Sequence, residues 1–224
     1  MTNSQPITLF GGTFNPPHWG HINPLKQAME ALDIATIGLL PCHIPPHKKT
    51  LNISNEHRLA MLKIVCRLEP SMYVENIELE SNDVSFTINT LKKLKKNHHQ
   101  SIFFVMGSDS FQSLKTWYQW QDILQLCNII VLNRNNQPLK ILKEVSQYIS
   151  CGPHHAVSLA DKRELSTNNG LVVSCHFPTV PVSSTLIREK LEKKDYRQLE
   201  TGELLPLEVF RYIKQHQLYE QNKS

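Results

Sequence analysis

The chain has 224 residues, of which 40% are hydrophobic and 20% charged, and its formal net charge is +4 at pH 7. That length suits one α/β domain with small additions and leaves little room for two full domains. The mild basic excess fits a protein that binds small anions and is too weak and scattered to predict nucleic-acid binding.

The sequence predicts no targeting or membrane segment. The N-terminus has no basic stretch followed by an apolar core, and no apolar run is long enough to cross a bilayer, so we expect neither a signal peptide nor a membrane partner. The five cysteines are widely spaced and odd in number. This pattern disfavours disulfides and predicts a reducing, cytoplasmic location.

The first predicted element is a buried strand at residues 7–10, followed by FGGTFNPPHWGH. Gly11 and Gly12 stand at the expected strand end, where glycine lets the backbone approach a ligand. A helical pattern then runs to about residue 32, with His18 and His21 three residues apart on one face. Free N–H groups and the positive end of a helix dipole meet here, so we predict a phosphate site with two imidazole donors. Taken separately, the glycines could form an ordinary turn and the histidines a surface pair or half a metal site.

A second buried strand at 34–40 completes a strand–helix–strand unit with a right-handed crossover. The proline-rich residues that follow place Lys48 near the substrate phosphates, or else form a stiff loop with a solvated lysine pair. A helix is predicted over 55–68 with Ser54 as its N-cap. Arg58, in the first turns of that helix, either lies on the surface or faces a phosphate.

The middle of the chain predicts a strand or extended edge at 72–79 and a helix that Ser85 caps and that runs to residue 96. A buried strand at 101–106 then ends in a second glycine turn. There, Asp109 either accepts hydrogen bonds from ribose hydroxyls or caps the next helix. The aromatic segment 117–120 is either core or a platform for a flat ring.

The rest of the chain predicts strands at 128–132 and 171–175, a helix at 138–149, and a polar, irregular segment at 151–169. Ser183 or Ser184 can cap a helix that carries Arg188 one turn further on. A helix N-terminus, hydroxyls and a guanidinium form a second anion pocket, although an ordinary cap beside a surface arginine is the alternative.

An amphipathic helix at 207–216 closes the chain. The order of elements predicts an α/β fold: a doubly wound parallel sheet with helices on both faces and a small C-terminal helical extension. We expect one domain, with its core over about 6–180 and the helical part over about 181–219.

The stretch at residues 10–21 resembles the GGTF(D/N)PxHxGH signature of HIGH-type nucleotidyltransferases. These are Rossmann-like enzymes that move a nucleotidyl group from a nucleoside triphosphate to a phosphorylated acceptor. The later segments PPHK, VSFTINTL, FVMGSDS, TWYQW and VSSTLIR extend the likeness over residues 7–219 to the bacterial nicotinate-nucleotide adenylyltransferases. The resemblance implies ATP and nicotinate mononucleotide as substrates, deamido-NAD and pyrophosphate as products, and Mg²⁺ that arrives with ATP. Composition and spacing alone indicate only nucleotide phosphates.

The resemblance also implies roles for individual residues. The catalytic group would be His18, His21, Lys48 and Arg188. Residues that bind ATP or phosphate would be Gly11, Gly12, Thr13, Phe14, Gly107, Asp109, Ser183 and Ser184. Residues that frame the mononucleotide would be Thr87, Trp117 and Tyr118. No side chain is expected to form a resident metal site.

Three residues depart from the family pattern. Asn15 stands where many members carry Asp, Phe86 where Tyr is common, and Cys42 where Asn is expected. The implied reaction needs no strong base, because the attacking phosphate is already ionised; the protein must align two anions and stabilise developing charge. The alternatives are the same transfer to nicotinamide mononucleotide or phosphopantetheine, and a non-catalytic nucleotide sensor.

Overall fold

A computed structural model describes residues 6–42, 53–80, 85–133, 145, 169–177 and 181–220. Lys48, the predicted helix at 138–149 apart from Val145, and nearly all of the predicted irregular segment 151–169 lie outside the described residues. In the part of the chain that is described, no helix is long and apolar enough to cross a membrane.

The centre of the molecule is a six-stranded sheet in which every neighbouring pair is parallel. From one edge to the other the strands are β3 (Met72–Val74), β2 (Ile37–Pro41), β1 (Ile7–Gly12), β4 (Ile102–Gly107), β5 (Asn128–Asn133) and β6 (Val172–His176). The chain builds outward from β1 in one direction and from β4 in the other, so these two strands lie side by side at the point where the order reverses. In such sheets, ligands bind at the carboxyl ends of the strands beside that point.

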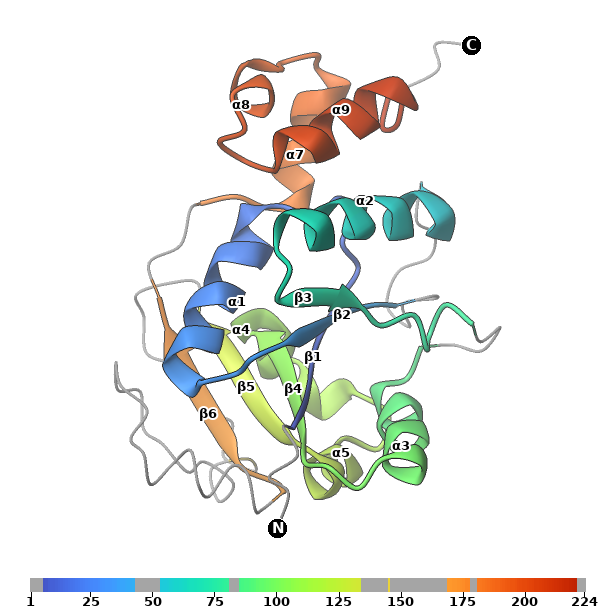
Figure 1. Cartoon of the computed structure of the whole chain (residues 1–224), viewed down its shortest axis with the longest axis vertical. Helices are drawn as coiled ribbons and strands as arrows, with labels where there is room; N and C mark the ends of the chain where they lie inside the picture. Colours follow the sequence, from blue (N-terminus) through green and yellow to red (C-terminus); the bar gives the residue numbers. More distant parts are fainter. Residues whose placement is uncertain are drawn as a thin grey trace.

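Helices cover both faces of the sheet (Figure 1). One face carries α1 (Trp19–Leu32) and α2 (Asn55–Leu68), with α7 (Ser184–Glu192), α8 (Arg197–Glu200) and α9 (Leu207–Gln215) beyond α2. The other carries α3 (Thr87–Asn97), α4 (Ser108–Gln112), the 3₁₀ turn η1 (Leu114–Thr116) and α5 (Trp120–Leu126). The doubly wound, Rossmann-like sheet predicted from the sequence is therefore confirmed.

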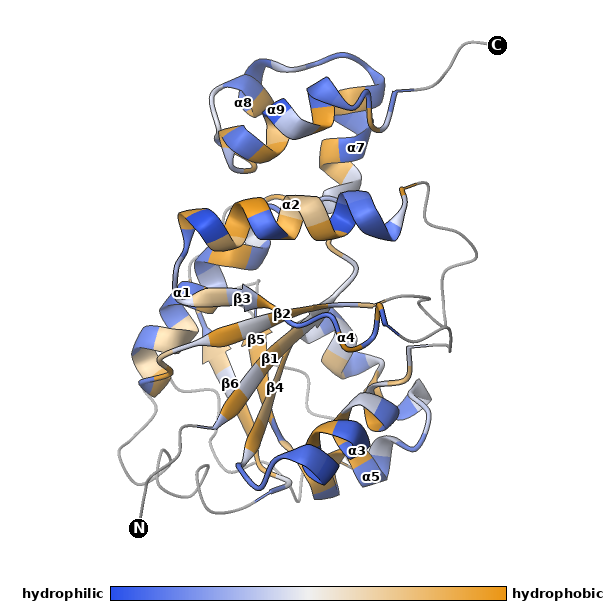
Figure 2. Cartoon of the chain, turned by 45° about the vertical axis from the view of Figure 1, so that its right-hand side comes forward, coloured by the Kyte–Doolittle hydropathy of each residue, from blue (hydrophilic) through white to orange (hydrophobic). Residues whose placement is uncertain are grey.

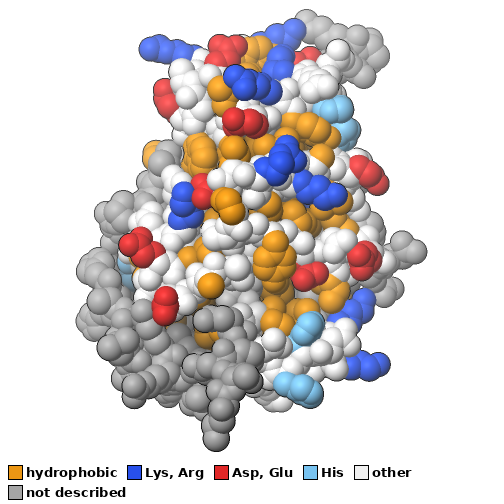
Figure 3. All heavy atoms as spheres, viewed as in Figure 1, with side chains coloured by type: hydrophobic (Ala, Val, Ile, Leu, Met, Phe, Trp, Pro, Cys, Tyr) orange, Lys and Arg blue, Asp and Glu red, His pale blue; other side chains and the backbone are white. Residues whose placement is uncertain are grey.

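Alternation along the strands fills two separate cores. In β1, Phe10 packs with the α1 and α2 side, whereas Leu9 packs with the α3 and α5 side, as expected when successive side chains point to opposite faces. The strands are accordingly mostly apolar and the helices apolar on one side (Figure 2). On the face drawn in Figure 3, described lysine and arginine side chains are spread among acidic and apolar ones.

The C-terminal helices lie beyond α2 and share a core with α1 and α2. They are also tied to the start of α1: the Trp19 indole Nε1 donates to the Gly202 carbonyl at 2.7 Å, and the Trp19 amide donates to the Leu204 carbonyl at 3.0 Å. Residue 202 has φ +74°, a conformation that favours glycine. The last helices are thereby fixed to the segment that carries the two histidines.

Several helix boundaries were predicted correctly and two caps were not. Ser54 and Ser183 cap α2 and α7 as expected, each accepting a hydrogen bond from a backbone amide three residues on. Ser85 does not cap α3, which starts at Thr87 with Phe86 at the N-cap. Asp109 does not cap α4 either, because Gly107 holds the N-cap and Asp109 lies in the first turn.

The strand predicted at 72–79 is also shorter than expected. It ends at Val74, and Asn76 then accepts backbone hydrogen bonds from Leu79 and Glu80. Asn76 also donates from its side chain to Glu80. Asparagine favours such turns because its side chain bonds the nearby chain, so local turn chemistry ends the strand here.

Candidate active site

The loop between β1 and α1 forms one side of the site. Phe14 lies in the left-handed region with φ +48°, and its ring is 1% exposed. That ring packs edge-on against Phe10 and His21, with centroid distances of 5.6 and 5.3 Å. A Cβ at Gly12 would come within 3.0 Å of the same ring. A side chain at position 12 would therefore press on the Phe14 ring.

The two histidines share one face of the start of α1, as their spacing predicted. Their rings stack with centroids 3.7 Å apart and an interplanar angle of 28°. His18 is the N-cap residue and is fully buried. A Cβ at Gly20 would lie 3.0 Å from the His18 ring and 2.9 Å from Val182, so Gly20 lets the ring and the chain before α7 approach the helix.

The α7 segment reaches the same loop from the far end of the sequence. Arg188 Nη1 donates to the Asn15 carbonyl at 2.7 Å, and Ser184 Oγ donates to the Pro16 carbonyl at 3.0 Å. Arg188 Nη2 also donates to Thr185 Oγ1 at 3.2 Å. The structure thus brings the serine–arginine turn to the loop that leads into His18, although these side chains bind loop carbonyls here.

A residue near the C-terminus completes this corner and was not anticipated. Tyr219 Oη donates to Asn15 Oδ1 at 2.6 Å, and burial raises the pKa of the Tyr219 phenol. An aspartate at position 15 would keep an acceptor at that point, so the Asn15 departure preserves the contact. No spacing or motif in the last residues pointed to Tyr219.

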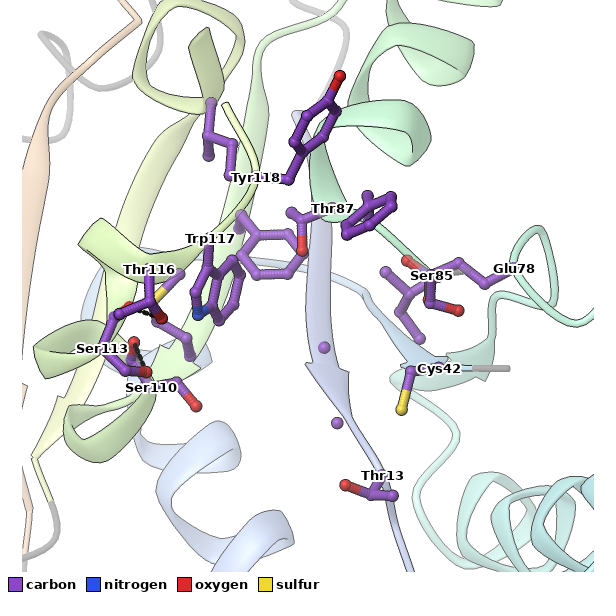
Figure 4. A pocket seen from close by; sticks show the side chains of 17 residues that line it. Thr13, Cys42, Glu78, Ser85, Thr87, Ser110, Ser113, Thr116, Trp117 and Tyr118 are labelled. Atoms are coloured by element: carbon purple, nitrogen blue, oxygen red, sulfur yellow. Dashed lines mark hydrogen bonds between the residues drawn. The ribbon is translucent and has the colours of Figure 1, made fainter. Parts of the chain in front are cut away.

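A cavity of about 410 Å³ opens on the other side of the β1 end. Its floor and walls come from the carboxyl ends of β1, β2 and β4, the start of α3, and the segment from α4 to α5. Thr87, Trp117 and Tyr118 lie towards one end of the cavity and Thr13 towards the other, with Cys42, Glu78 and Ser85 along one side (Figure 4).

The sequence-predicted residues therefore divide into groups. The cavity lining contains Gly11, Gly12, Thr13, Thr87, Trp117 and Tyr118. The loop corner contains Phe14, His18, His21, Ser184 and Arg188. Gly107 ends β4 and Asp109 lies just after it; neither lines the cavity, and Asp109 is exposed.

The aromatic end of the cavity combines two short segments. Phe86 and Tyr118 place their ring centroids 4.9 Å apart, so a phenyl ring at position 86 packs without a hydroxyl. Phe86 is the N-cap residue of α3, and no side chain caps that helix. The positive end of an 11-residue helix therefore adjoins the cavity beside Thr87.

A buried carboxyl lines the cavity and was missed in the sequence. Glu78 is 8% exposed and accepts a hydrogen bond from Thr90 Oγ1 at 2.7 Å. Burial raises the pKa of Glu78, and hydrogen bonds from Thr90 and Ser85 oppose that rise. Ser85 thus bonds Glu78 instead of capping α3. The sequence placed Glu78 in a predicted strand or extended edge, and nothing there marked it as a site residue.

Arg58 does not lie on the surface. It is fully buried and donates to two backbone carbonyls and to Asn55 Oδ1. Among the residues that the structure describes, no group of three histidine, cysteine or acidic side chains is placed to hold a metal ion.

The fold and this corner define a nucleotide-binding α/β class. Residues 9–190 match the cytidylyltransferase-like family. The proteins named probable nicotinate-nucleotide adenylyltransferase from Shewanella frigidimarina and Idiomarina loihiensis are both 35% identical over 214 residues. These alignments cover 95% and 94% of this chain and 99% and 98% of theirs.

Solved structures agree in fold. The Plasmodium falciparum nicotinic acid mononucleotide adenylyltransferase complexed with NaAD superposes with a TM-score of 0.71 at 19% identity, over 96% of this chain and 97% of that one. The same protein complexed with APC gives 0.69 at 18% identity, with the same coverage. The chain belongs to the cytidylyltransferase-like family and, within it, to the nicotinate-nucleotide adenylyltransferases.

Proposed function

We propose that the protein transfers the adenylyl group of ATP to nicotinate mononucleotide, giving deamido-NAD and pyrophosphate. The observation that carries the proposal is the adjacency of two unlike sites at the end of β1: an aromatic-ended cavity on one side and the histidine–arginine corner on the other. The names of the full-length relatives, and the NaAD complex of a structural neighbour, support this substrate pair.

The cavity would take the acceptor. Trp117 would stack on the pyridine ring, with Tyr118 beside it, and the main chain at Thr87 would donate to the ring carboxylate. The uncapped start of α3 favours an anion at that point. An acid would therefore be preferred over the neutral amide of nicotinamide mononucleotide.

The corner would take the ATP phosphates. Backbone at Gly11, Gly12, Thr13 and Phe14, the His18 and His21 rings, and the start of α7 with Ser183 and Ser184 would surround them. Arg188 has five N–H groups, so its bonds to Asn15 and Thr185 leave donors for a phosphate oxygen. Gly107 and Asp109 would lie against ribose, and Lys48 would approach the triphosphate or the acceptor.

The reaction requires alignment and charge stabilisation. A 5′-phosphate oxygen of the mononucleotide attacks the α-phosphorus of ATP, the bond to the bridging oxygen breaks, and pyrophosphate leaves. The phosphate nucleophile is already ionised, so the imidazoles and guanidinium serve to offset negative charge that builds on the transferred and leaving groups. A divalent cation, for which we propose Mg²⁺, would be held chiefly by the triphosphate and would screen its charge.

The test is a pyrophosphate-release assay with ATP and each of three acceptors. We expect turnover with nicotinate mononucleotide and much slower turnover with nicotinamide mononucleotide or phosphopantetheine. Equal rates with the two pyridine nucleotides would contradict the acceptor assignment. Binding of ATP without turnover on any acceptor would indicate a nucleotide sensor.

A further inference from the structure

One buried guanidinium joins three segments that meet behind the cavity. Arg58 Nη1 donates to the Thr13 carbonyl at 3.0 Å, and Nη2 donates to the Cys42 carbonyl at 2.6 Å and to Asn55 Oδ1. The side chain has no exposed surface. Arg58 therefore connects the loop after β1, the residue after β2 and the start of α2.

The two carbonyls lie where the ladder between β1 and β2 ends. The Cys42 amide donates to the Gly12 carbonyl at 3.1 Å, which continues the pairing one residue past β2. A buried carbonyl without a partner is costly, so the Thr13 and Cys42 carbonyls need donors at this end of the ladder. The planar guanidinium of Arg58 can donate to both carbonyls at once, whereas an ammonium has no fixed fork.

The same two residues belong to the site. Thr13 and Cys42 both line the cavity, and Thr13 begins the loop that leads to His18. Within the described part of the chain, Arg58 forms no salt bridge, and a buried charge without one is a poor way to stabilise a core. Its two backbone contacts indicate that it orders the cavity wall.

We propose that Arg58 is a positioning residue of the active site: through the Thr13 and Cys42 carbonyls it fixes the separation of the β1 and β2 ends and the direction of the loop that carries His18. It does not touch substrate. The kinetic part of this inference rests on the proposed adenylyl transfer, because misplacement of the loop would reduce turnover most.

The kinetic test compares Arg58→Lys, which keeps the charge, with Arg58→Met, which keeps much of the length and loses every donor. We expect kcat to fall about 10- to 100-fold in both, with KM for each substrate changed less than about threefold, because small misplacements of catalytic groups act on the transition state. Arg67→Met, at an exposed position in the last turn of α2, is the matched control and should keep kcat within about twofold.

A second control separates positioning from stability. Val172→Ala removes buried volume at the first residue of β6, at the opposite end of the sheet, and should lower thermal stability without lowering kcat. Wild-type kcat in Arg58→Lys would overturn the proposal. So would a kcat loss in Val172→Ala equal to that of the Arg58 variants at matched thermal stability.

Two further measurements cover the remaining outcomes. If the Arg58 variants do not fold, Asn55→Ala removes the third contact of Arg58 and leaves its two carbonyl contacts in place. We expect kcat to fall about two- to fivefold, of the order of one hydrogen bond; unchanged kcat would overturn the proposal. If the wild type transfers no adenylyl group, hydrogen exchange is the deciding measurement. Arg58→Met, or Asn55→Ala if Arg58→Met does not fold, should speed exchange at the amides of residues 13–15 and 18 and leave β4 and β5 protected. Unchanged exchange at residues 13–15 and 18 would overturn the positioning role independently of the proposed function.

Discussion

The two sides of the β1 end are built in different ways. The cavity takes its ring-framing residues from two short segments, around Thr87 and around Trp117, that are about 30 residues apart and whose helices α3 and α5 pack together. In the corner, Ser184 donates a hydrogen bond to Pro16 and Tyr219 donates one to Asn15. These partners are 168 and 204 residues apart in the sequence. The acceptor side can therefore change locally, whereas the corner exists only when the two ends of the chain have come together.

The chemistry of the two sides differs in the same way. The cavity walls include apolar side chains of β2 and β4, such as Leu40, Phe104 and Met106. The corner consists of imidazoles, a guanidinium and hydroxyls on loop carbonyls. This contrast implies that substitutions in the cavity change KM for the acceptor and that substitutions in the corner change kcat.

The largest expected effect belongs to the corner. His18→Ala removes a buried ring that stacks on His21, and we expect kcat to fall by about 10² or more while both substrates still bind, because donors matter most where charge develops. Steady-state kinetics together with equilibrium binding of ATP measure both quantities. Turnover near that of the wild type would contradict the corner's catalytic role.

Substitution of Arg188 provides a second test of the corner. Arg188→Met leaves the Asn15 carbonyl without that donor and removes the positive charge, and we expect kcat to fall about 10- to 100-fold. The matched control is Arg197→Met on α8, which should change kcat by less than about twofold. An equal loss in both variants would show that the effect is not local to the corner.

Trp117 tests the cavity side. Trp117→Ala removes the proposed stacking surface, and we expect KM for nicotinate mononucleotide to rise about 3- to 10-fold, in line with aromatic pair energies, while KM for ATP stays within about twofold. Initial rates at varied concentrations of each substrate give the two constants. A rise in KM for ATP alone would reverse the assignment of the two sides.

The smallest effect concerns Glu78. Because burial raises its pKa, the folded state holds its proton more tightly than the unfolded state does. Glu78 therefore makes its full contribution to the free energy of unfolding at pH values below its ordinary pKa, and that contribution is lost as the pH rises above that pKa. Thermal unfolding should therefore show Glu78→Gln gaining roughly 1 to 3 °C relative to the wild type between about pH 4 and about pH 7.

The control for this pH dependence is Glu30→Gln, on the exposed side of α1. It removes one exposed carboxylate and leaves Glu78 in place. A Glu78→Gln difference that is flat with pH, or that moves in favour of the wild type, would contradict the direction assigned to Glu78.

Most of the architecture follows from local pattern. Apolar runs that end in Gly11 and in Gly107 predicted two central strands, and the three-residue spacing predicted that His18 and His21 share a face. Residues whose partners are distant in sequence could not be found this way. Tyr219 and Arg58 depend on how the end of the chain and the two strand ends meet, and Glu78 depends on a turn where an extended segment was expected.

The most direct test of the two-sided account is a crystal structure with deamido-NAD bound, since one product molecule spans both sides. We predict the pyridine ring between Thr87 and Trp117 in the cavity, and the phosphates beside His18 and the start of α7. A pyridine ring outside the cavity, or phosphates away from His18 and Arg188, would contradict the account.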